Sequence, residues 1–169
     1  EFHHAGSILT GLQYDSIYHE HLFYFSPETL GALCASHGLH AFEVFESPLS
    51  GGALVMVFAK EQRTPPSRLK ECVRRESESK VNLLETWEAF GKAVRVHSES
   101  LSQMVAERAK RGTVVGYGAS ARSATLLNTA GISGEEVQAV IDQNELKHGR
   151  LTPGSDIPIV PFEEGRLVL

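Results

Sequence analysis

The stretch Thr113-Val-Val-Gly-Tyr-Gly-Ala-Ser-Ala121 sets the fold expected for the C-terminal third of the chain. A short apolar strand runs directly into a G-x-G-x-x-A turn, and a run suited to a helix follows. The next apolar run, Val137-Gln-Ala-Val-Ile-Asp142, predicts a second strand that ends in an acid. Strand, turn, helix, strand and acid in this order predict a Rossmann-like parallel βαβ unit in an α/β chain.

This turn also predicts a nucleotide-type pocket. Glycines at Gly116 and Gly118 would let the backbone approach a phosphate, and the helix that begins near Ser120 would attract its charge. Asp142 would then bind sugar hydroxyls. Two alternatives stay open, a plain βαβ unit with an empty tight turn and an NAD-dependent oxidoreductase or other dinucleotide binder. Ile157-Pro-Ile-Val160 predicts a third strand.

The part that precedes this unit predicts helices. Pro65-Pro66 marks a boundary, and no proline interrupts residues 69–111, where apolar residues recur every three or four positions. This spacing predicts one amphipathic helix or two in sequence, which would bridge neighbouring domains; a dimeric coiled coil is the alternative. We therefore expect three segments: residues 1–60, a linker with bridging helices over residues 61–111, and an incomplete Rossmann-like unit over residues 112–169.

Residues 1–60 predict a helix followed by a hairpin. Ser26-Pro27-Glu28-Thr29 is a helix start with a Ser cap, Pro at the first position and an acid near the positive end. The helix should end at His37, before Gly38. Residues 39–45 and 53–59 read as strands, and a loop that contains two glycines joins them.

A second unusual stretch, Tyr14-Asp-Ser-Ile-Tyr-His-Glu-His-Leu-Phe-Tyr-Phe-Ser26, holds four adjacent residues that can move protons or bind metal. One reading of this stretch is an acid–base site with His21 as base, Glu20 orienting it and Tyr18 as hydroxyl donor. A polar strand end is the plainer alternative. His19 and His21 would share one face of a strand and could bind a metal. The remaining histidines lack ligand spacing, so no metal site is predicted.

These motifs resemble the sugar C-methyltransferases, S-adenosylmethionine-dependent enzymes that methylate a carbon of a nucleotide-linked keto-deoxysugar. The Tyr-His-Glu-His stretch is similar to their signature, and so are residues 116–128 with Gly131-Ile132. Residues 141–144 with Lys147, Gly149-Arg150 and Pro153-Gly154 match as well. The resemblance covers nearly the whole chain in order and spacing.

The resemblance implies a mechanism and a place in a larger fold. Tyr18, Glu20 and His21 would be catalytic, with His21 removing the proton next to a ketone, and His19, Gly116, Gly118, Ser120 and Asp142 would bind the nucleotide-sugar substrate. Residues 1–60 would be the antiparallel end of a class I methyltransferase fold. We expect S-adenosylmethionine to bind to a missing N-terminal half, so that the fragment alone is inactive and binds no cofactor.

Composition excludes several other classes of function. The 169 residues carry a net charge of −5 with acids and bases interspersed, which argues against a nucleic-acid partner. Cys34 and Cys72 are far apart, which argues for a reducing compartment and against a disulfide framework. No apolar run reaches membrane-spanning length. We expect a soluble, cytoplasmic protein with no membrane partner.

Overall fold

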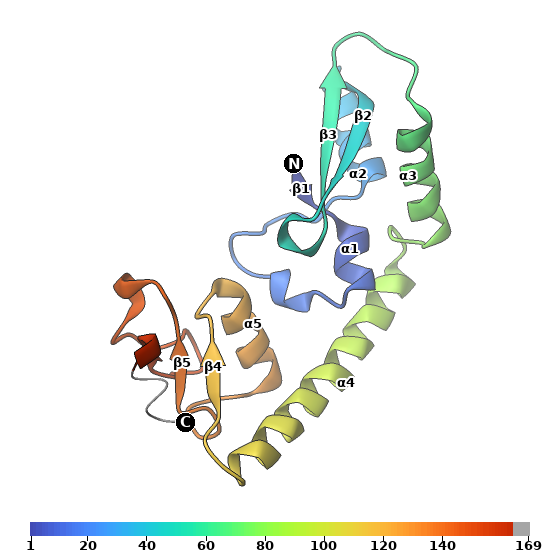
Figure 1. Ribbon diagram of the computed structural model, residues 1–169. Coiled ribbons are helices and arrows are strands. Elements are labelled where there is room, and N and C mark those ends of the chain that lie inside the picture. The colour runs from blue at the N-terminus through green and yellow to red at the C-terminus, as the bar shows by residue number, and fades with distance from the viewer. Residues whose placement is uncertain (164–169) are drawn as a thin grey trace. The chain divides into compact units, whose positions relative to one another are not determined.

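The computed structural model describes residues 1–163, which divide into two compact units (Figure 1). The first unit contains Glu1–Gln13 and His21–Lys92, and the second contains Tyr14–Glu20 and the chain from Ala93 onward. The division therefore differs from the three segments expected from the sequence. One long helix, α4 (Leu84–Ala109), contributes to both units, so the expected linker does not form a segment of its own.

The first unit is built around a three-stranded sheet. Its strands are β1 (Phe2–His3), β2 (His40–Ser47) and β3 (Ala53–Ala59). The order is β1-β3-β2, and β3 runs antiparallel to both neighbours. The antiparallel hairpin predicted from the sequence is therefore present. Its buried core combines strand residues with residues of α3 (Ser67–Glu78): Val44, Leu54, Met56, Leu69 and Cys72.

The helices of this unit begin where local signals place them. In α2 (Pro27–Ala35), the Ser26 hydroxyl accepts the Thr29 N–H at 3.1 Å, and the Thr29 hydroxyl accepts the Ser26 N–H at 3.0 Å. This capping box confirms the predicted start. The helix ends at Ala35, two residues before the predicted end, and Gly38 adopts a φ of +73° in the turn that follows. A shorter helix, α1 (Ala5–Thr10), follows β1.

The second unit contains the parallel strand–helix–strand unit that the glycine turn predicts. Its elements are β4 (Val115–Tyr117), α5 (Ala121–Ala130), β5 (Ala139–Ile141) and β6 (Ile159–Val160). The strands are parallel in the order β4-β5-β6. The core beneath them is apolar and receives Leu101 and Val105 from α4; its buried members are Ala130, Ile132, Val137, Val140 and Ile157. Across residues 1–163, no helix combines the length and apolar character that a membrane crossing requires.

A substitution at Ile157 tests this core, because the Ile157 side chain is fully buried. We expect Ile157→Ala to lower the free energy of unfolding by about 2–5 kcal/mol, since the change removes apolar contacts and leaves a cavity. Leu146→Ala is the matched control, because Leu146 is 80% exposed and should shift stability by less than about 0.5 kcal/mol. Urea denaturation followed by circular dichroism measures both, and equal effects would contradict the assigned core.

Candidate functional site

The Tyr-His-Glu-His segment is a turn and not a strand. Tyr18 and His21 are half-buried, whereas His19 and Glu20 are exposed. The boundary between the two compact units falls between Glu20 and His21. Tyr18, His19 and Glu20 therefore belong to the second unit, and His21 belongs to the first. The alternation of faces expected for a strand does not apply here.

His21 packs against a second imidazole in the first unit. Its ring lies 6.0 Å from the His3 ring, centroid to centroid, at an interplanar angle of 81°. His3 Nε2 lies 2.8 Å from Gln13 Oε1, and Gln13 Nε2 donates to the Gly51 carbonyl at 2.8 Å. Because a carbonyl only accepts, the Gln13 amide nitrogen faces Gly51 and its oxygen faces His3. His3 Nε2 must then carry a hydrogen, which fixes the orientation of the ring beside His21.

The two glycines of the hairpin loop, Gly51 and Gly52, are required by the backbone angles of the loop and by its close contacts. Gly51 has a φ of +85°, and a Cβ there would lie 2.8 Å from Gln13 Nε2. Gly52 has a φ of +127°, and a Cβ there would lie 2.5 Å from the Ser7 hydroxyl oxygen. Both positions therefore need glycine for the backbone angle and for close approach to a side chain from the first thirteen residues.

The segment before Tyr18 is anchored within the second unit. The Tyr14 hydroxyl lies 3.1 Å from His97 Nδ1, and their rings meet edge-on at 5.7 Å. Asp15 Oδ2 accepts a hydrogen bond from Arg122 Nε of α5 at 2.8 Å and forms an ion pair with Arg122 Nη2 at 2.8 Å. Burial, and to a smaller extent the Asp15 carboxylate, raises the pKa of Tyr14 above its usual value. These contacts fix the N-terminal side of the motif.

Sequence reasoning missed these anchoring residues. Arg122 lies within the matching glycine motif of residues 116–128, and His97 lies within the stretch predicted to be helical, but neither was assigned a role. His3 entered only as one of several histidines without ligand spacing, and Gln13 did not enter at all. Their partners lie between 10 and 107 residues away in the chain, beyond the reach of the local patterns that predict helices and strands. Within residues 1–163, no three His, Cys, Asp or Glu side chains are grouped so that they could share a metal ion.

The glycine turn of the second unit is closely packed on one side and open on the other. A Cβ at Gly116 would lie 3.1 Å from Val140 Cγ2, which explains the first glycine by close packing of β4 on β5. Gly118 has a φ of +93° and has open space around the position of a Cβ. Ser120 caps α5 through a capping box with Ser123. The local geometry is thus the one that the motif predicts.

The backbone N–H groups of this turn already have acceptors inside the protein. Gly118 donates to the Ile141 carbonyl at 2.7 Å, Ala119 to Asp142 Oδ2 at 2.7 Å, and Ser120 to the Ser123 hydroxyl at 2.8 Å. An internal carboxylate thus occupies the anion position that such a turn offers. A phosphate that approached these N–H groups would have to displace Asp142. Contact of Gly116, Gly118, Ser120 and Asp142 with a substrate stays a prediction.

Asp142 is the centre of a small polar network. Its carboxylate also accepts the Asn144 N–H at 2.8 Å and the Lys147 ammonium at 3.0 Å. Lys147 donates in addition to the Ala119 carbonyl at 2.8 Å. The Asn144 N–H, with the Lys147 ammonium and the Ala119 N–H, holds the pKa of Asp142 below its usual value and outweighs the opposing effect of burial.

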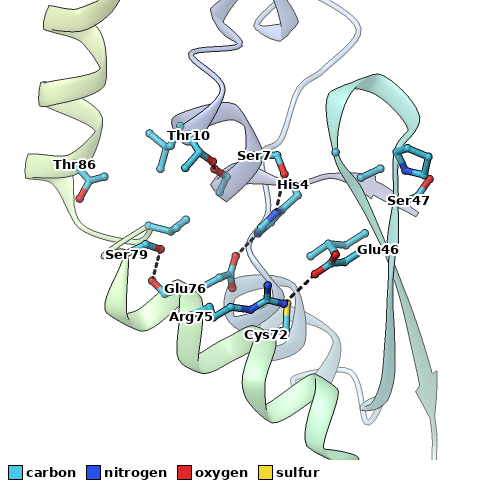
Figure 2. Close-up of a pocket in the computed structure, with 17 residues that line it drawn as sticks. His4, Ser7, Thr10, Glu46, Ser47, Cys72, Arg75, Glu76, Ser79 and Thr86 are labelled. Atoms are coloured by element: carbon cyan, nitrogen blue, oxygen red, sulfur yellow. Dashed lines mark hydrogen bonds and ion pairs between the residues drawn. The ribbon is translucent and has the colours of Figure 1, made fainter.

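A pocket of about 820 Å³ lies in the first unit, lined by α1, the β2–β3 loop and α3 (Figure 2). None of the site residues predicted from the sequence is among the described residues that line it. Its polar wall holds His4 between Ser7 and Glu76. This cluster was not predicted, because the sequence gives no reason to pair residues 4 and 76.

The depressed pKa of Asp142 predicts an acid-sensitive contribution to stability. A carboxyl group whose folded-state pKa lies below its unfolded value of about 3.9 stabilises the fold above that pH. The contribution disappears as pH falls through the folded-state pKa. We expect Asp142→Asn to cost about 1–3 kcal/mol at pH 7 and to flatten the loss of stability below about pH 4. Urea melts at pH 7 and pH 3 measure both effects, and an unchanged pH dependence in the variant would contradict the assignment.

Comparison with known proteins places the chain in a family. Residues 48–166 match the model of the C-methyltransferase C-terminal domain. The chain is also similar to the C-methyltransferase NovU of Streptomyces niveus, with 32% identity over 157 residues. That alignment covers 90% of this chain and 37% of the relative, so the chain spans well under half of the length of that protein. By the match over residues 48–166, the chain belongs to the C-methyltransferase C-terminal domain family.

Proposed function

We propose that the protein that contains this chain is an S-adenosylmethionine-dependent C-methyltransferase that acts on a nucleotide-linked keto-deoxysugar. The observation that carries this proposal is the match to the C-methyltransferase family, which extends along most of the chain. The β1-β3-β2 order, with β3 antiparallel to its neighbours, supports the view that residues 1–60 are the end of a class I methyltransferase sheet. The parallel β4-α5-β5 unit supports the Rossmann-like assignment.

His21 is the general base in this proposal. Its imidazole takes the proton from the carbon next to the ketone. The C–H bond breaks, the proton passes to the ring nitrogen, and the electron pair moves to the carbonyl oxygen to give an enolate. The fixed imidazole of His3 supports this role, because it limits the rotation of the half-buried His21 ring. The enolate carbon then becomes the position that is methylated.

The neighbouring side chains of the motif bind and orient the substrate. We assign to Tyr18 and Glu20 the orientation of the base and the holding of the sugar, and to His19 a substrate contact. The exposure of His19 and Glu20 supports these roles, since a substrate hydroxyl can reach them. The anchors at Tyr14 and Asp15 support them too, because they immobilise the chain just before Tyr18.

We assign the nucleotide part of the substrate to the turn that contains Gly116, Gly118, Ser120 and Asp142. The open space at Gly118 supports an approach of the ligand from that side. The carboxylate of Asp142 is an acceptor suited to sugar hydroxyls. A diphosphate either binds beside the Ala119–Asp142 hydrogen bond or replaces the Asp142 carboxylate as the acceptor of the Ala119 N–H.

The described residues do not fit a site for S-adenosylmethionine. The one glycine-rich turn between a parallel strand and a helix in residues 1–163 has its N–H groups bound internally and carries the Asp142 carboxylate. We therefore assign proton removal and substrate binding to this chain. S-adenosylmethionine, bound by another part of the protein, would supply the methyl group.

The test is carried out in the full-length gene product with the nucleotide-linked keto-sugar. We expect His21→Ala to lower the rate of methyl transfer by about 10²–10⁴-fold, because the proton acceptor is lost. The variant should also lose exchange of the substrate α-hydrogen with deuterium from solvent, a reaction that reports enolate formation alone. His37→Ala is the control, since His37 is exposed and lies in the turn after α2. Undiminished deuterium exchange in His21→Ala would refute the assignment of the base.

A further inference from the structure

The pocket of the first unit holds a hydrogen-bonded row of serine, histidine and glutamate that the methyl-transfer proposal does not use. His4 precedes α1 in an extended conformation, and its Nδ1 lies 3.1 Å from the Ser7 hydroxyl oxygen. Its Nε2 lies 2.6 Å from Glu76 Oε1. Figure 2 shows the imidazole between these two side chains in the wall of the pocket.

The hydrogen-bond polarity of this row follows from its acid end. Glu76 is 4% exposed, and as a carboxylate it can only accept. His4 Nε2 therefore carries the hydrogen, which leaves the lone pair on Nδ1, and the Ser7 hydroxyl must donate to it. Among the described residues no lysine or arginine pairs with Glu76. The neighbouring Arg75 pairs instead with Glu46 at 2.9 Å. The carboxylate thus orients the imidazole through this hydrogen bond.

We propose that Ser7 is a nucleophile that accepts an acyl group from a small ester bound in this pocket. A hydroxyl hydrogen-bonded to an imidazole, itself oriented by a buried carboxylate, is the arrangement that activates serine. The Ser7 oxygen attacks the ester carbonyl while its proton passes to His4 Nδ1. The carbonyl–alkoxy bond then breaks, and the departing oxygen takes the proton from Nδ1–H. Water, deprotonated by the same nitrogen, cleaves the acyl-serine to the free acid.

The pocket distinguishes Ser7 from the other hydroxyls in its lining. Its volume of about 820 Å³ lies in the range of small-molecule sites. Of the four other lining hydroxyls, three donate to backbone carbonyls: Thr10 to Gly6, Ser79 to Glu76, and Thr86 to Lys80. The fourth, Ser47, accepts the Leu49 N–H at 3.4 Å. Gly52 lies against the Ser7 oxygen, where a side chain would cover it.

The experiment uses the full-length gene product with p-nitrophenyl acetate and an alkyl fluorophosphonate. We expect one covalent adduct, mapped to Ser7 by peptide mass spectrometry and absent in Ser7→Ala. His4→Gln and Glu76→Gln should slow adduct formation by at least about 100-fold, because the base or its orientation is lost. Ser79→Ala is the matched control in the same pocket and should be labelled at the wild-type rate.

Two further outcomes keep the proposal open to refutation. Gly52→Ala retains Ser7, His4 and Glu76 but introduces a methyl group 2.5 Å from the position of the Ser7 oxygen, so it should displace the hydroxyl from His4 and block labelling. Circular dichroism confirms that each variant is folded. No adduct on the folded wild-type protein, or an adduct that persists in Ser7→Ala, would overturn the proposal. Methyl transfer does not enter this measurement, so the two proposals fail or stand separately.

Discussion

The first unit depends on one constraint at the end of β1. The side chains of the neighbouring residues His3 and His4 point in opposite directions there. Successive residues of an extended chain point in opposite directions. His3 therefore reaches Gln13, whereas His4 reaches Ser7 and Glu76. The loop between β2 and β3 contacts the region around both histidines.

Two adjacent glycines of the hairpin loop bind this region, one through Gln13 and the other through the His4 backbone. Gly51 accepts a hydrogen bond from Gln13, and the Gly52 carbonyl accepts the His4 N–H at 3.3 Å. The same few atoms thus fix the loop, the start of α1 and the ring beside His21. A substitution that displaces one of these three features should therefore displace the other two.

The elements that could be predicted from the sequence are those with local signals. The cap at Ser26, the hairpin strands and the parallel unit around Gly116 depend on residues within a few positions of one another. The end of α2 was predicted too late, because it was placed directly before Gly38, whereas Ser36 and His37 form a turn between the helix and that glycine. Residues 69–111 gave two helices in sequence, one of the two readings left open.

The polar networks could not be predicted, and the reason is physical. Tyr14 and His97, Asp15 and Arg122, and His4 and Glu76 are each brought together by tertiary packing across more than seventy residues. Hydrophobic periodicity carries no information about such pairs. The motif containing His21 was found by its composition, but its supporting contacts required the structure.

The turn at Gly118 illustrates a second limit. An acid at the end of the second strand is expected both in a nucleotide site and in a turn closed by its own side chain. The sequence is the same in either case, and the structure has the Asp142 carboxylate bound to the turn. This arrangement weakens the dinucleotide reading, since the N–H groups that would hold a pyrophosphate are engaged. It leaves open a ligand that approaches the exposed side of Gly118.

That internal carboxylate has a consequence for ligand affinity. Many phosphate loops become ordered only when an anion arrives, and the cost of ordering then reduces the observed affinity. Here Asp142 and Lys147 hold the loop in shape beforehand. A ligand that leaves this ion pair in place binds a rigid, preorganised surface, so its affinity is not reduced by the entropic cost of ordering the loop.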